Sequence, residues 1–365
     1  MALYVLFFLF ITVTSYAFVD ANFPWQPPFI FSIADATHRI ISTTLYIFII
    51  AGLFMLYGHL LRKVRDGSIG SLRVWRIILI GSAILLFAYP AFSHDIFNYI
   101  ATARVLFLYG ENPYIIMPIE LTNEPILAYM HAPNKTALYG PLWIILTAFP
   151  HFASLGNPIL SVFMYKAFIL LFYLGCAWAV WILGNRKTFP LAFFALNPLV
   201  VIESLVSAHN DVVMMFFALS AFLLIRKNLL VSGIASFIFS VLIKFATGIL
   251  SPLIVWLVYL LLKNERIKWN KIWLWSTGLM FVVFLLSPLR EEIYSWYFIW
   301  VLAFVALLPW NRSIHPIALA FSFGVPLRIV PYLATGSWFG LTPVIKSVVT
   351  FLPPLITGLW KWVKK

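Results

Sequence analysis

The chain has 365 residues, of which 63% are hydrophobic and 10% are charged, and its mean hydropathy is +0.97. Soluble domains of this length are not so apolar, so the composition predicts an integral membrane protein. The formal net charge is +13, but in a membrane protein the positions of basic residues matter more than their sum, and we expect no nucleic-acid partner. Cys176 is the single cysteine, which excludes an intrachain disulfide.

Apolar runs of about the 20 residues that a helix needs to cross a bilayer recur along the chain. They lack the two-residue alternation of barrel strands. The sequence therefore predicts an all-α fold, a polytopic bundle of about 12 spans within a single integral-membrane domain, residues 1–365. The expected spans are 2–19, 40–61, 75–92, 160–183, 188–206, 211–225, 229–245, 247–262, 272–288, 295–310, 313–331 and 343–360.

The first apolar run, Met1 to Ala17, ends in Ser-Tyr-Ala and could pass for a signal peptide. It lacks a basic segment at its start, so we expect an uncleaved first span.

Most basic residues fall in short loops between the expected spans. The positive-inside rule places such loops in the cytoplasm. They hold 17 of the 25 Lys and Arg residues but only two of the 12 acids, Asp66 and Glu265. We therefore expect a cell-membrane protein with both termini in the cytoplasm and most acidic residues at the outer face. The basic residues are Arg62, Lys63, Arg65, Arg73, Arg76, Arg186, Lys187, Arg226, Lys227, Lys263, Arg266, Lys268, Lys271, Arg312, Lys361, Lys364 and Lys365.

Residues 141–155 do not fit this alternation. They are apolar, but a full crossing there would place Arg186 and Lys187 outside and invert every later loop. Pro150 and His151 also interrupt them. We expect a re-entrant or interfacial helix covered by protein, with a thirteenth crossing as the alternative.

The stretch from Ser93 to Tyr114 gathers acidic, basic and amide side chains beside an expected span, within a long outer loop, 93–140. Ionisable groups near membrane depth are costly and mark candidate functional sites. In a helix, Asp95, Asn98 and Thr102 share one face, whereas Arg104 lies on the other side. We expect Asp95 to be the catalytic group, and a solvated interfacial helix is the alternative.

Other polar groups are expected at the same face. His209, Asn210 and Asp211 follow Ala208 between two apolar spans, where they form either a turn or part of the site. Lys244 and Arg290 are isolated cations that suit an anionic phosphate at the interface, although snorkelling explains them equally well. Arg328 is a third such cation.

An aromatic segment, Tyr294 to Trp300, opens a late span. An interfacial belt explains such residues without any function. Aromatic faces also stack on sugars, so Trp296 and Tyr297 are candidate substrate contacts.

Four motifs in order resemble the GT-C superfamily of polytopic glycosyltransferases, especially the mannosyltransferase-like members that use polyprenyl-phosphate sugars. They cover about residues 75–310, and each is weak alone. The motifs are His94-Asp95 through Asn112-Pro-Tyr114, Tyr139-Gly-Pro-Leu-Trp143, Asn197-Pro-Leu-Val continuing to Ala208-His-Asn-Asp211, and Trp296-Tyr297.

The resemblance implies an inverting transfer of a hexose, with mannose as the expected sugar, from a polyprenyl-phosphate donor to a glycan, lipid or protein hydroxyl at the outer face. Asp95 falls at the position of the family's acidic base, with His94 as a possible partner. Many members carry two acids there, and this chain carries one, which argues against a bridging metal. We expect no cofactor beyond the lipid-linked donor. The expected substrate-binding residues are His94, Asn98, Arg104, Tyr139, His209, Asn210, Asp211, Lys244, Arg290, Trp296 and Tyr297.

Two other functions fit the same residues. A transporter or flippase of an anionic amphipathic lipid would use the basic residues along a path and Asp95 as a gate. A ligase of lipid-linked polymers would differ from the leading hypothesis in its donor.

Overall fold

A computed structural model describes residues 1–363 apart from 20–29, 31, 122–123 and 131. The predicted all-α class is confirmed, because every regular element among the described residues is a helix. The α-helices are α1 (Ala2–Ser15), α2 (Arg39–Arg65), α3 (Ser71–Leu86), α4 (Asp95–Phe107), α5 (Pro141–Leu146), α6 (Ala148–Ala153), α7 (Pro158–Leu183), α8 (Thr188–Ala195), α9 (Pro198–Val201), α10 (Asp211–Arg226), α11 (Leu230–Ile243), α12 (Ser251–Leu262), α13 (Trp269–Leu286), α14 (Phe298–Val305), α15 (Ile314–Gly324), α16 (Val330–Thr335) and α17 (Thr342–Val363).

Six helical segments of the described chain are long and apolar enough to cross a membrane. A seventh, α8 followed by α9 and η5 (Ile202–Val206), is bent by 55° between its two parts. The other expected spans are shorter helices, α1, α3, α10, α11 and α14, so the count of about 12 stays a prediction. The six segments are Ala36–Arg65, Pro158–Leu183, Phe245–Leu262, Trp269–Leu289, Ile314–Thr335 and Thr342–Val363.

Residues 141–155 form two short helices, α5 and α6, rather than one long one. At 1.5 Å per residue, the stretch Pro141–Ala153 reaches about 20 Å, which is less than the roughly 30 Å of a hydrocarbon core. This length supports the interfacial placement expected from the charge pattern.

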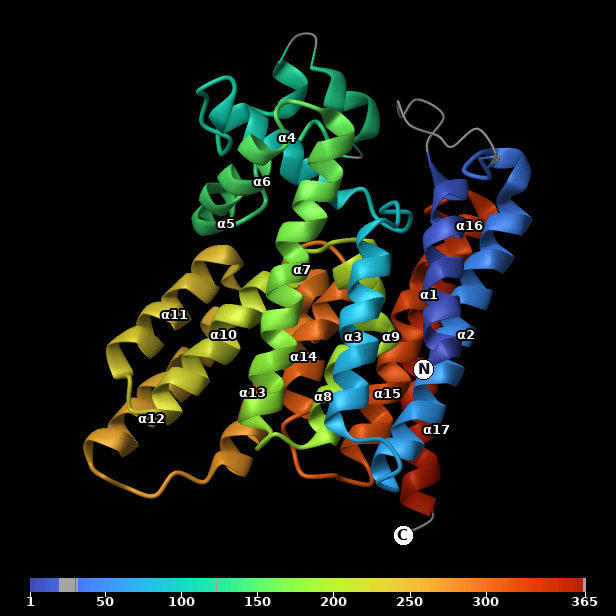
Figure 1. Ribbon diagram of the computed structural model, residues 1–365. Helices are drawn as coiled ribbons and strands as arrows, with labels where there is room; N and C mark the ends of the chain where they lie inside the picture. Colours follow the sequence, from blue (N-terminus) through green and yellow to red (C-terminus); the bar gives the residue numbers. More distant parts are fainter. Residues whose placement is uncertain (20–29, 31, 122–123, 131, 364–365) are drawn as a thin grey trace.

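The basic loops gather at one end of the molecule. In Figure 1 the connections α2–α3, α7–α8, α12–α13 and α14–α15 lie at the lower end, where the chain also ends, whereas α4, α5 and α6 lie at the opposite end. Those connections and the helix ends beside them carry most of the basic residues expected in the cytoplasm, and Arg226 and Lys227 lie at the α10–α11 connection. Lys364 and Lys365, the last two of these basic residues, lie outside the described residues.

The chain leading into α4 is held by a buried lysine. Lys166 on α7 donates from Nζ to the carbonyl oxygens of Leu85, 2.9 Å away, and Ala88 at the end of α3. Ser15 Oγ accepts from the Tyr89 amide at 2.8 Å. The two lysine bonds satisfy carbonyl groups that the end of α3 leaves without partners. Together with the serine bond they fix the segment that leads to Asp95.

The helical segment before His209 is interrupted between α8 and α9, and the interruption has a local cause. Asn197 caps α9 by accepting from the Leu199 amide at 3.0 Å, and Pro198 occupies the first helical position. The following turn, η5, is a π-helix, a form often found at functional sites. Ala208 then takes a left-handed conformation, φ 59°, so the chain turns sharply into His209 and α10.

Candidate active site

Asp95 is the first residue of α4, and its side chain is 29% exposed. Its Oδ2 lies 3.4 Å from Nδ1 of His209, and its Oδ1 lies 3.5 Å from Nδ2 of Asn98. His94, directly before it, occupies the N-cap position of the same helix without a capping hydrogen bond from its side chain. A carboxylate that is partly exposed to solvent, and that neighbouring side chains hold in position, can take up a proton from a substrate hydroxyl.

His209 connects Asp95 to a second acid. The imidazole is fully buried, and its Nε2 lies 3.2 Å from Oε2 of Glu203 in the π-helix η5. Ser295 donates a hydrogen bond from Oγ to Oε1 of the same Glu203. Two carboxylates therefore face the two nitrogens of one ring, an arrangement that favours the doubly protonated imidazolium.

The surroundings shift the pKa of both titrating partners outside the spans. Burial opposes the charge on His209, but the carboxylates of Asp95 and Glu203 outweigh burial and raise its pKa to about 9. Burial likewise opposes the charge on Asp95, but the contact with His209 and the charges of His209 and Lys244 lower its pKa. Asp95 is thus ionised and His209 is positively charged near neutral pH.

Aromatic rings cover this pair. Trp296 stacks on the His209 ring with centroids 3.8 Å apart and an interplanar angle of 19°. Tyr294 stacks on Trp296 in turn, with ring centroids 4.5 Å apart and an interplanar angle of 8°. Both rings come from η8 (Ser295–Tyr297) and the residue before it. The face of Trp296 attracts the imidazolium electrostatically and so offsets part of the cost of burying its charge.

Asp211 and Lys244 form a second ion pair. Lys244, at the end of α11, places Nζ 3.0 Å from each carboxylate oxygen of Asp211, at the start of α10. Trp300 Nε1 donates to Oδ1 of the buried Asp211 at 2.6 Å. The ammonium also lies 4.9 Å from the centre of the Tyr297 ring. This pair compensates the cost of burying either charge alone.

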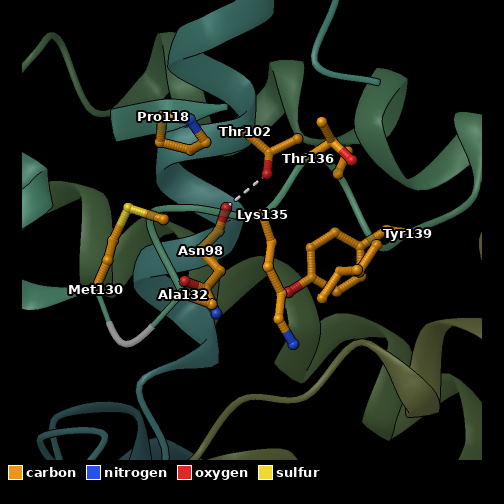
Figure 2. Close-up of a pocket in the computed structure, with 10 residues that line it drawn as sticks. Asn98, Thr102, Pro118, Met130, Ala132, Lys135, Thr136 and Tyr139 are labelled. Atoms are coloured by element: carbon orange, nitrogen blue, oxygen red, sulfur yellow. Dashed lines mark hydrogen bonds between the residues drawn. The ribbon is translucent and has the colours of Figure 1, made fainter. Parts of the chain in front are cut away.

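A small pocket lies between α4 and the outer loop; Asp95 does not line it, but Asn98, which contacts Asp95, does. Figure 2 shows Asn98, Thr102 and Tyr139 around it, with Thr102 Oγ1 donating to the Asn98 carbonyl oxygen at 2.8 Å. This arrangement agrees with the helical face predicted from the spacing. The remaining lining residues are Pro118, Met130, Ala132, Lys135, Thr136, Ala137 and Leu138.

Two side-chain amides have unused hydrogen-bonding capacity. Asn210 is buried; its backbone N–H donates to the Tyr99 hydroxyl at 3.2 Å, and its side-chain Oδ1 lies 3.4 Å from the same hydroxyl oxygen. Asn210 Nδ2 and Asn98 Oδ1 have no hydrogen-bond partner among the described residues. Buried polar atoms are usually satisfied, so these two atoms are suited to a bound hydroxyl or water.

Two expected substrate contacts lie apart from this group. Arg104 is on the far side of α4, as its spacing predicts, and its Nε lies 2.9 Å from Oε1 of buried Glu124. Arg290 is exposed at the end of η7 (Ser287–Leu289), and within the described chain no hydrogen bond or ion pair joins its guanidinium to Asp95 or Lys244. In the same described part, no set of three or more His, Cys, Asp and Glu converges on a metal position.

The sequence did not single out Glu203, Ser295 or Trp300 as site residues. Glu203 is an isolated acid in an apolar run, and that isolation was the available signal. Trp300 resembles any belt residue until Asp211 is placed beside its indole nitrogen.

Comparisons with known proteins agree with the resemblance drawn from the motifs. Residues 4–260 match the family model described as alpha-(1->6)-mannopyranosyltransferase, N-terminal domain. The chain is 26% identical over 243 residues to alpha-(1->6)-mannopyranosyltransferase A of Mycobacterium tuberculosis (strain ATCC 25618 / H37Rv), which covers 63% of this chain and 45% of that protein. The protein of the same name in Corynebacterium glutamicum is 25% identical over 178 residues, 47% of this chain and 36% of its own length.

The chain spans less than half the length of these curated relatives. No solved structure matches it. Trp296 and Trp300, which close the site, lie beyond the residues that the family model covers. Because that model covers most of the chain, the predicted GT-C membership is confirmed, and the protein belongs to the alpha-(1->6)-mannopyranosyltransferase N-terminal-domain family of membrane glycosyltransferases.

Proposed function

We propose that the chain is an inverting mannosyltransferase that moves mannose from a polyprenyl-phosphate donor to an acceptor hydroxyl, with its site at the extracytoplasmic face. The observation that carries the proposal is the Asp95–His209–Glu203 row, in which one partly exposed carboxylate is supported by two buried ionisable groups. The family match supports mannose as the sugar. The concentration of basic loops at the end opposite α4 supports the sidedness.

The reaction is a single displacement. The acceptor oxygen forms a bond to the anomeric carbon while the bond from that carbon to the phosphate oxygen breaks. Asp95 takes the proton of the acceptor hydroxyl, and the electron pair of the broken bond leaves with the phosphate. A phosphate is a stable anion and needs no acid to protonate it, so one base and nearby cations suffice.

Each supporting residue has a separate task in this scheme. His209 orients Asp95 and keeps it ionised, and Glu203 with Ser295 holds the imidazolium in place. Asn98 and Tyr139 offer amide and hydroxyl groups in the lining of the pocket, where sugar hydroxyls need partners. Asn210 offers a further side-chain amide whose Nδ2 has no partner among the described residues. Lys244 is paired with Asp211, so we assign it two roles: it holds α10 and α11 together, and its charge contributes positive electrostatic potential at the site.

The test is a transfer assay with the purified 365-residue chain in lipid nanodiscs. Mannose labelled in a polyprenyl-phosphate donor is expected to appear in an oligomannoside acceptor, and the same label supplied as a nucleotide sugar is expected to remain untransferred. Use of the nucleotide sugar alone would contradict the proposed donor. In proteoliposomes, movement of the intact lipid donor across the bilayer without bond cleavage would instead identify a flippase.

A further inference from the structure

A third charge cluster lies where η9 (Pro326–Ile329) meets α17. Glu292 pairs with two cations, Arg328, whose Nη2 lies 2.9 Å from Oε1, and Lys346, whose Nζ contacts the same oxygen. Arg328 Nη1 also donates to Thr350 Oγ1 at 2.8 Å. The Arg328 and Lys346 side chains are 12% and 10% exposed, so α15–α17 hold both cations in fixed positions.

This cluster is less neutralised than the Lys244–Asp211 pair. Lys244 has a full carboxylate to itself and two short contacts with it. Arg328 and Lys346 share one carboxylate, so the group keeps one positive charge in excess. An arrangement with surplus cations needs an anion, and phosphate is the usual partner at a membrane interface.

The cluster is bordered on one side by aromatic rings. Trp338 lies over the Lys346 ammonium, 4.6 Å from ring centre to Nζ, and stacks on Tyr332 at 3.8 Å. Next to Trp338, Phe339 and Leu341 are 83% and 74% exposed. An anion site beside exposed apolar side chains suits a ligand with a phosphate head and a hydrocarbon tail.

The cluster is close in sequence to the aromatic residues that contact His209. Glu291, the neighbour of Glu292, accepts from the Tyr294 hydroxyl at 3.2 Å. Tyr294 stacks on Trp296, which stacks on His209 beside Asp95. In Figure 1, α16 lies at the same end of the molecule as α4. Trp296 is stacked against both His209 and Tyr294, so this row positions the segment that leads from Glu292 to the neighbourhood of Asp95.

We infer that Arg328 and Lys346 bind the phosphate of the lipid-linked donor, with Trp338 and the exposed apolar residues beside it directing the hydrocarbon chain. The identity of the ligand as the sugar donor rests on the proposed function. The site lies beyond the residues matched by the family model, so the C-terminal part of the chain supplies the donor's anchor.

Binding is measured without turnover, so that it does not depend on transfer. The probe is a polyprenyl phosphate that carries no sugar, added to the 365-residue chain in zwitterionic nanodiscs, with native mass spectrometry as the readout. Lys346→Gln and Arg328→Gln are each expected to raise the Kd about tenfold or more, because each removes a charge-assisted contact. Lys346→Arg is expected to stay within about threefold of the parent. The matched control is Lys263→Gln, which removes an exposed cation in the α12–α13 connection, at the other end of the molecule (Figure 1), and is expected to leave the Kd unchanged.

A second variant separates loss of the site from loss of the fold. Glu292→Gln removes the competing carboxylate and is expected to tighten binding about threefold or more, which a damaged fold cannot do. Polyprenol without phosphate is expected not to compete, and inorganic phosphate is expected to compete weakly. Unchanged Kd values in Lys346→Gln and Arg328→Gln would overturn the inference, as would equal displacement of the probe by phosphatidylglycerol, which would mark a general anionic-lipid site.

The two proposals fail in different ways. Loss of probe binding in the variants of a protein that shows no mannosyl transfer supports the phosphate site and contradicts the transfer reaction. Transfer with an unchanged donor KM in Lys346→Gln supports the reaction and overturns the site.

Discussion

At the scale of single residues, the site is governed by how charges are paired. His209 is buried between two carboxylates, and Asp211 is buried between a lysine and an indole N–H. In both groups a charge is stable only while its partner remains, because an unpaired charge in a dry environment costs several kcal/mol. Removing one partner of such a pair is therefore expected to cost more stability than removing both.

The first prediction concerns pH. The pKa of His209 is raised from about 6.5 to about 9, so the protonated ring stabilises the fold fully below about pH 6.5 and this contribution is lost as pH rises through 9. Above that pH a neutral imidazole can donate to only one carboxylate, and Asp95 loses its support. We expect both transfer activity and thermal stability to fall through about pH 9 in the parent.

His209→Gln is the comparison, because glutamine cannot gain or lose a proton there. Its transfer activity is expected to be lower throughout and to show no step near pH 9. An identical alkaline step in this variant would assign that step to another group.

The second prediction concerns Asp211. Asp211→Asn leaves the Lys244 ammonium partly buried without its counter-charge, and we expect a loss of about 3 kcal/mol or more in unfolding free energy. Adding Lys244→Met to that variant removes the orphaned charge and is expected to restore more than half of the loss. The measurement is denaturant unfolding of the parent, Asp211→Asn, Lys244→Met and the double variant in the same detergent, as a double-mutant cycle. Additive losses would mean that the two side chains do not act as a pair.

At the scale of elements, the close approach of α5 to α11 positions Lys244. The Gly140 amide donates to the Ile243 carbonyl oxygen at 3.0 Å, and a Cβ on Gly140 would stand 2.1 Å from the Leu242 carbonyl oxygen. Only glycine permits this contact without moving a backbone segment.

The third prediction follows from this contact. Gly140→Ala is expected to shift the end of α11, to cost about 1–3 kcal/mol of unfolding free energy, and to lower transfer activity. Gly278→Ala in α13, where an added Cβ meets no atom within 4 Å, is the control and is expected to be neutral or slightly stabilising. Equal behaviour of the two variants would contradict the account of this contact.

The same scale shows what the sequence can predict. Asp95, Asn98 and Thr102 were placed on one face because a regular helix fixes their spacing, and that face is the one observed. Glu203 could not be placed against His209, because their contact depends on the π-helix at Ile202–Val206 and on the left-handed Ala208. Neither the π-helix nor the left-handed conformation is indicated by the amino-acid types in this segment.

Ion pairs between residues far apart in the sequence could not be predicted either. Arg328 and Lys346 occupy different helices, and Glu292 lies in a third segment, so no spacing rule relates them. The number of spans is also undecided by the pattern, because α3, α10 and α14 are shorter than a full crossing even though their sequences are apolar.

At the scale of the whole molecule, the account depends on which end faces outward. Basic connections lie at one end and α4–α6 at the other. The positive-inside rule then places Glu111, in the loop after α4, outside and Lys263, after α12, inside. Both side chains are exposed, and Cys176 is fully buried, so the native thiol should stay silent in labelling.

The fourth prediction tests this orientation. In intact cells a membrane-impermeant maleimide is expected to label Glu111→Cys and not Lys263→Cys, and Lys263→Cys is expected to react only after the membrane is permeabilised. The unmodified chain supplies the background. The reverse pattern would place the proposed site in the cytoplasm.

The central claim is that Asp95 is the base for mannosyl transfer, and the most direct measurement compares transfer rates of the parent, Asp95→Asn and Glu111→Gln. Glu111 is the control because it is an exposed acid in the same outer loop. General-base catalysis contributes about 10²–10⁴-fold, so we predict a loss of that size in Asp95→Asn, with unchanged donor binding, and near-parent activity in Glu111→Gln. Asp95→Asn is expected to fold but to be less stable than the parent, because the His209 imidazolium then keeps Glu203 as its one carboxylate partner. Undiminished transfer by a folded Asp95→Asn protein would contradict the account.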